Sequence, residues 1–112
     1  MKMWLDDVRP APPGWHRVYD VDQAKHLLLS GAVEECSLDH DLGLGVPNGT
    51  DLVNWMAEHD VWPPVRPCVH SANPVGAERM NGIIDRYGPY PKNSMPARRR
   101  PQQPSWSRTG SW

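Results

Sequence analysis

A chain of 112 residues with a formal net charge of −1 has room for one domain with a modest hydrophobic core. Acidic residues arrive by position 6 and no apolar run is long enough to cross a bilayer, which argues against a signal peptide or a membrane span. The two cysteines, Cys36 and Cys68, form no C-x-x-C pair, so we expect buried, reduced thiols in a cytoplasmic protein.

The N-terminal third of the chain predicts two short strands and one helix. Residues 2–6 form the first strand, and the proline-rich residues 9–15 that follow cannot be helical, because proline removes backbone donors and keeps its predecessor extended. Residues 16–19 resume as a second strand. Asp20 is a suitable N-cap for a helix whose apolar positions recur at helical spacing and which ends near Gly31.

The remainder of the domain alternates strands with helices. Residues 33–39 form a third strand, and a glycine-rich loop separates it from a helix over residues 51–60. Residues 65–71 form a fourth strand. Asn73 then caps a helix over residues 74–87, with proline at the favourable first position. Alternation of this kind predicts a parallel sheet with right-handed crossovers.

The last part of the chain differs in composition from the rest. Residues 89–112 hold five cations and no acid, so residues 1–88 hold seven cations against 13 acids. Repeated proline mixed with arginine, serine and glutamine cannot bury enough apolar surface to fold. We therefore predict a folded domain over residues 1–88 and a flexible tail over residues 89–112. Its Arg98–Arg100 cluster could bind an RNA end, although a solvated basic tail explains it as well.

Polar side chains follow three of the predicted strands at the point where each strand ends. In an open parallel sheet these ends lie side by side and the crevice outside them binds ligands. Converging carboxylates are costly unless a cation lies among them, and a hard cation such as Mg²⁺ or Mn²⁺ prefers oxygen ligands. The candidate metal ligands are Asp6, Asp7, Asp39 and Asp41. Loop capping would explain one or two of these acids, and Asp41 could simply turn the chain.

Histidine, serine, asparagine and arginine lie beside these acids. His40 and His70 are candidate general acids or bases, because imidazole titrates near neutral pH. Ser71 and Asn73 could donate hydrogen bonds to a phosphate, and the helix that Asn73 opens attracts anions at its N-terminus. Arg9 could bind a phosphate in a bidentate manner. The alternatives are a plain N-cap for Asn73 and a salt bridge to Asp7 for Arg9, and Arg79 is a weaker candidate.

Three motifs resemble known proteins. The acid pair after the first strand, Asp39 after the third and Ser71 after the fourth resemble the receiver domains of two-component signalling, and the resemblance covers residues 3–87. Three runs are more closely similar to the cyclic-phosphate processing receiver-like family. These runs are Trp-Leu-Asp-Asp-Val-Arg-Pro, Leu-Asp-His-Asp-Leu-Gly and His-Ser-Ala-Asn-Pro.

The resemblance implies a truncated receiver-like, flavodoxin-like α/β fold, either three-layered or an open two-layered one, with four parallel strands in the order 2-1-3-4. It also implies metal-dependent chemistry on cyclic phosphates. Asp39 matches the aspartate that receivers phosphorylate, and it joins His40 and His70 as a catalytic candidate. The chain departs from receivers in lacking a helix between the first two strands. It also lacks a fifth strand with its lysine, since Lys92 lies in the predicted tail.

The preferred function is divalent-metal-dependent hydrolysis of a cyclic phosphate or phosphodiester. The alternative is a signalling or binding module that accepts phosphate on Asp39 or binds a nucleotide without turnover, and the missing lysine argues against phosphoacceptance.

The three helices should also cover a single face of the sheet. The other face would then carry an exposed apolar patch, and we predict that this face, with Trp4 or Trp15 near it, is closed by self-association or by a partner domain.

Overall fold

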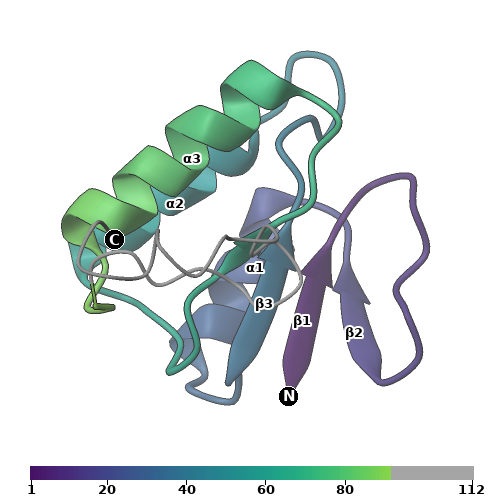
Figure 1. The fold of residues 1–112 in the computed structure, drawn as a ribbon. Coiled ribbons are helices and arrows are strands. Elements are labelled where there is room, and N and C mark those ends of the chain that lie inside the picture. The colour runs from purple at the N-terminus through teal and green to yellow at the C-terminus, as the bar shows by residue number, and fades with distance from the viewer. Residues whose placement is uncertain (92–112) are drawn as a thin grey trace, which may run out of the picture.

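Four parallel strands form the sheet within residues 1–91, which are the residues that the computed structural model describes. Figure 1 shows β1 between β2 and β3. The strand order is β2-β1-β3-β4, as the sequence predicted. Trp4 of β1 shows how the neighbouring strands align with it. It lies opposite Arg17 of β2 on one side and Ser37 of β3 on the other. The strands are β1 (Lys2–Leu5), β2 (Trp15–Val18), β3 (Glu35–Leu38) and β4 (Cys68–Val69).

The fourth strand is much shorter than the predicted span of residues 65–71. It keeps two residues, because Pro67 has no N–H to donate to a ladder and interrupts the pairing before Cys68. The chain still follows β3 on either side of this break. Val65 donates its N–H to the carbonyl of Glu34 at 3.1 Å, and His70 donates to the carbonyl of Leu38 at 3.0 Å.

Each helix begins at a side chain that caps it. In α1 (Val21–Leu29) the carboxylate of Asp20 accepts the N–H of Gln23. Helix α2 (Gly49–His59) starts two residues before its predicted start, because Asn48 and Asp51 form a reciprocal capping box. In α3 (Pro74–Tyr87) the side chain of Asn73 accepts the N–H of Gly76, as expected of an N-cap.

One face of the sheet carries the hydrophobic core, and we call it the helix face. Met3, Leu5 and Leu38 are fully buried there and pack in one cluster with apolar side chains from α1, α2 and α3. Figure 1 shows α1 behind the strands. Within residues 1–91 the fold therefore has two layers, a sheet and a layer of three helices.

The opposite side of the sheet, which we call the Trp4 face, carries aromatic and polar side chains. Trp4 is only 7% exposed, so it does not add to an exposed apolar patch, contrary to our expectation for this face. Its ring stacks on His70, meets the edge of Trp15 and donates its indole N–H to the carbonyl of Arg9 at 3.2 Å. Self-association through this face stays a prediction.

The ordered contacts run past Gly88. Tyr90 packs against the core cluster, donates its hydroxyl to the carbonyl of Pro63 at 2.6 Å and meets the edge of Trp62. Of the predicted tail over residues 89–112, the structure describes residues 89–91, and the remainder, including the basic cluster, lies outside the described residues. Among the helices of the described chain, none combines the length and apolar character needed to cross a membrane.

Candidate functional site

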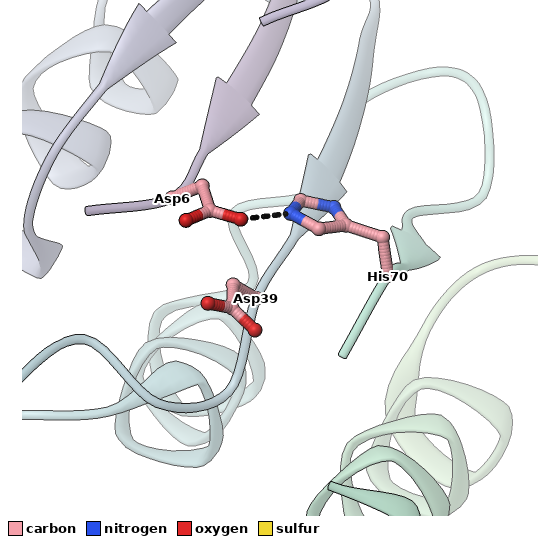
Figure 2. Close-up of side chains that lie close together, drawn as sticks. All are labelled: Asp6, Asp39 and His70. Carbon is pink, nitrogen blue, oxygen red and sulfur yellow. Dashed lines mark hydrogen bonds and ion pairs between the residues drawn. The ribbon is translucent and has the colours of Figure 1, made fainter. Parts of the chain in front are cut away.

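Two carboxylates and one imidazole meet at the carboxyl edge of the sheet. Asp6 directly follows β1, Asp39 follows β3 and His70 follows β4. Figure 2 shows the three side chains close together, with the Asp6 carboxylate facing the His70 ring and Asp39 beside them. One possible ligand atom from each lies within 4.8 Å of the others, so the three form a group that could hold a metal ion.

The carboxylate of Asp6 is fully buried and has hydrogen-bond donors on both oxygens. Its Oδ1 accepts the backbone N–H groups of Val8 and Arg9, each at 2.8 Å, which folds the chain tightly after β1. Its Oδ2 accepts from the Arg9 guanidinium at 3.2 Å and from His70 Nε2 at 3.0 Å. Burial by itself raises the pKa of Asp6, but these hydrogen bonds outweigh it, so the pKa lies below its ordinary 3.8.

Asp39 has the opposite electrostatic balance. Burial raises its pKa above the ordinary 3.8, and the negative charges of Asp6 and Asp41 raise it further. The backbone N–H of His40, donated at 2.8 Å, and the Arg9 guanidinium, 3.8 Å away, offset this only in part. The two neighbouring carboxylates therefore differ in pKa, and Asp39 is the one whose negative charge is poorly compensated.

A glycine lets helix α2 begin against the backbone of Asp39. A Cβ at Gly49 would lie 2.2 Å from the carbonyl oxygen of Asp39 and 2.6 Å from a Met80 side-chain carbon, so no larger residue fits without a backbone shift. Gly49 also donates its N–H to the carbonyl of His40 at 2.8 Å. The start of α2 thus sets the position of the segment that carries Asp39.

An open cleft of about 330 Å³ lies over these strand ends, and we call it the acid cleft. Its lining includes all four carboxylates that the sequence analysis put forward as metal ligands, together with Arg9. Arg9 bridges Asp6 and Asp39 here and not Asp7, the partner that we had considered for it. The four acids are Asp6, Asp7, Asp39 and Asp41.

The two histidines differ in how they are held, and neither belongs to the lining of the acid cleft. His70 uses both ring nitrogens, Nε2 toward Asp6 at 3.0 Å and Nδ1 toward Ser37 Oγ at 2.7 Å. His40 directs Nδ1 to the exposed carboxylate of Asp41 at 2.8 Å. Its ring fits against Gly76, where a Cβ would lie 2.5 Å from a ring atom.

The candidate phosphate ligands after β4 lie elsewhere. Ser71 Oγ accepts the backbone N–H of Asn73 at 3.0 Å, and Ser71 lines a separate hollow of about 630 Å³ along α3 instead of the acid cleft. The side-chain oxygen of Asn73 caps α3, and its side-chain nitrogen lies 3.5 Å from Nδ1 of His40. Arg79 is exposed on α3 and lines neither of these hollows.

Sequence reasoning did not single out Ser37, and it considered Trp4 only as part of an exposed face. Both contact the His70 ring. The alternation of side chains along a strand could have placed them on one face, but their contact with His70 depends on how β1, β3 and β4 align.

A parallel sheet in the order β2-β1-β3-β4, with carboxylates after β1 and β3, defines a receiver-like α/β protein. The family model described as the cyclic-phosphate processing receiver domain matches residues 1–86. The chain therefore belongs to this family, as the three motifs indicated. No curated protein sequence and no solved structure gave a significant match.

Proposed function

We propose that the protein hydrolyses a cyclic phosphate in the acid cleft with the help of a divalent cation, Mg²⁺ or Mn²⁺. The observation that carries the proposal is the group formed by Asp6, Asp39 and His70, whose potential ligand atoms lie within 4.8 Å of one another. This group lies beside the Arg9 guanidinium, at the carboxyl edge where open parallel sheets bind ligands.

The charge distribution of the acid cleft suits a hard cation. Asp39 has a raised pKa because it is buried and because the carboxylates of Asp6 and Asp41 lie near it, and a divalent cation would stabilise its ionised form. The oxygens of Asp39 and Asp6 would hold the cation, and Asp7 and Asp41 could add direct or water-mediated contacts. His70 would support Asp6, because Mg²⁺ and Mn²⁺ prefer oxygen ligands to imidazole. When bound, the cation would stabilise charge on a phosphoryl oxygen and acidify a bound water.

The residues of the cleft divide the remaining work. Arg9 is 48% exposed and its guanidinium lies between the two buried carboxylates, so a cation held by both would take its place, and the guanidinium would turn to a phosphoryl oxygen. In the reaction, the oxygen of a water forms a bond to phosphorus and one ring P–O ester bond breaks. The departing oxygen takes a proton, and the product is a phosphate monoester.

The proton donor that we propose is His40, which lies beside the acid cleft because its hydrogen-bond partner Asp41 lines that cleft. Asp41 occupies its Nδ1, which leaves Nε2 to donate a proton, whereas both nitrogens of His70 have partners. Replacing His40 with alanine should lower the rate by about 10²–10⁴ while metal binding changes little. A His40→Ala protein with the wild-type rate would remove His40 from the mechanism.

The test is incubation of the full chain with 2′,3′-cyclic nucleotides, with and without Mg²⁺ or Mn²⁺, followed by detection of monophosphate by ³¹P NMR. Turnover should require the cation and should be lost in Asp39→Asn. Asp22→Asn removes a carboxylate from the exposed surface of α1 and is the matched control, which should keep full activity.

Other results would select another function. Binding of the nucleotide without turnover would indicate a binding module. A phosphorylated chain after incubation with acetyl phosphate, detected by mass spectrometry and absent in Asp39→Asn, would indicate a phosphoacceptor. Cys36 and Cys68 are both buried and are not joined in a disulfide, which supports our proposal of a cytoplasmic location. We also propose that RNA ends bind to residues 98–100 and that copies associate through the Trp4 face, which sedimentation at micromolar concentration tests.

A further inference from the structure

Trp4, Ser37 and His70 lie in a row on the Trp4 face, and the proposed function gives no role to Trp4 or Ser37. Trp4 is aligned with Ser37, and Ser37 is aligned with Cys68. His70 follows Cys68 by two residues, so it projects to the same side. Neighbouring strands thus bring Trp4, Ser37 and His70 together from three separate parts of the chain.

The contacts within this row hold the imidazole of His70 from two directions. Ser37 Oγ lies 2.7 Å from Nδ1, and the Trp4 ring stacks on the imidazole with centroids 3.8 Å apart and planes 5° apart. Trp4 is itself fixed, since its indole N–H donates to the carbonyl of Arg9. Stacking on Trp4 fixes the plane of the imidazole, and the hydroxyl of Ser37 fixes its rotation within that plane. The second ring nitrogen, Nε2, therefore points in one direction.

In that direction lies the carboxylate of Asp6. Nε2 of His70 lies 3.0 Å from Asp6 Oδ2. The dashed line in Figure 2 marks this interaction. An ionised carboxylate only accepts hydrogen bonds, so Nε2 must carry the proton, and in the neutral ring Nδ1 then accepts the hydroxyl proton of Ser37. Ser37 is fully buried, so its oxygen serves this hydrogen bond and is not placed to attack a substrate.

We propose that Ser37 and Trp4 are positioning residues of the acid cleft. They orient His70, and His70 orients the Asp6 carboxylate toward the place where a cation would bind. Replacing a residue that hydrogen-bonds to a metal ligand and orients it typically lowers metal affinity or activity about 10–100-fold. The step from His70 to the cation rests on the proposed function, whereas the orientation of His70 does not.

The first measurement is Mn²⁺ binding by the full chain, followed by electron paramagnetic resonance. Ser37→Ala should bind Mn²⁺ about 10–100-fold more weakly than the wild type at an unchanged circular dichroism spectrum, and Ser37→Thr, which keeps the hydroxyl, should restore binding. Trp4→Phe should keep the stacking and most of the affinity, whereas Trp4→Leu should not. The matched control is Cys36→Ala, whose side chain is on the helix face and which should change stability but not affinity.

The second measurement needs no metal. In ¹⁵N NMR of the metal-free wild type, His70 should show the single tautomer with the proton on Nε2, and in Ser37→Ala it should show a mixture. An unchanged tautomer and an unchanged Mn²⁺ affinity in Ser37→Ala would overturn the proposal. A wild type that binds no Mn²⁺ would instead refute the metal-dependent function, and the NMR spectra would still decide whether Ser37 positions His70.

Discussion

The two faces of the four-stranded sheet differ in the kind of contact that their side chains make. On the helix face, Met3, Leu5 and Leu38 are aliphatic or thioether side chains that need only apolar neighbours. On the Trp4 face, the buried Ser37 and Trp4 have specific hydrogen-bond or stacking partners. Burial of apolar area stabilises without direction, whereas hydrogen bonds fix orientation and add little net stability. We infer that the helix face holds the fold and the Trp4 face holds the geometry of the acid cleft.

The largest effect should come from breaking the helix face. Leu38 is fully buried in the core, so Leu38→Ala should lower the free energy of unfolding by about 2–5 kcal/mol through lost burial and a cavity. Its neighbour Ser37 points to the other face, and Ser37→Ala should cost only about 0.5–1.5 kcal/mol. Urea unfolding of both variants checks the contrast, and equal losses would contradict it.

The next effect concerns Asp6, which joins the Trp4 face to the cleft. Asp6→Asn replaces a charged acceptor of several hydrogen bonds and should cost about 1.5–3 kcal/mol at neutral pH. Because the folded-state pKa is lowered, the stabilisation is present above the ordinary 3.8 and disappears as the pH falls through the folded-state value. Unfolding curves of variant and wild type should therefore converge in acid, and a constant difference at every pH would refute this account.

A third effect tests the contact between the helix layer and the cleft. Gly49→Ala places a Cβ against the carbonyl of Asp39 and should destabilise the fold by about 1–3 kcal/mol while it displaces the acid. Gly82 in α3 is the matched control, because a Cβ there meets nothing within 4 Å. Gly82→Ala should stabilise the helix by about 0.5–1 kcal/mol. Thermal melts of both variants measure the difference in stability between Gly49→Ala and Gly82→Ala. Equal stability would show that the start of α2 does not fix the position of Asp39.

The smallest effect has the opposite sign. Asp39 has a raised pKa, so its ionised form opposes folding above that pKa, and the metal-free Asp39→Asn protein should be more stable than the wild type at neutral pH. The gain should be smaller than the loss in Asp6→Asn, because Arg9 already offsets part of the repulsion. It should shrink as the pH falls through the raised pKa toward 3.8. A less stable Asp39→Asn protein in EDTA would show that this carboxylate is well compensated.

The sequence predicted the elements because their signals are local. Acids at strand ends, the caps Asp20 and Asn73, and the strand-helix alternation each depend on residues close in the chain, and the family motifs supported the strand order. Four acids in one cleft also followed, because parallel strands place their carboxyl ends at one edge. The short β4 was missed, although Pro67 was a visible signal against a long strand.

Only the tertiary structure decided how the site residues are used. Asp6 and Asp39 look alike in sequence, yet Asp6 has donors on both oxygens and Asp39 is buried near other negative charges. Val8 and Arg9 supply the nearby donors to Asp6, but the remaining donor is His70, 64 residues away in the chain. Ser71 turned toward Asn73, whereas Ser37 met His70 across two strands. Periodicity tells to which face a side chain points, but its partner is set by the alignment of strands from distant parts of the chain.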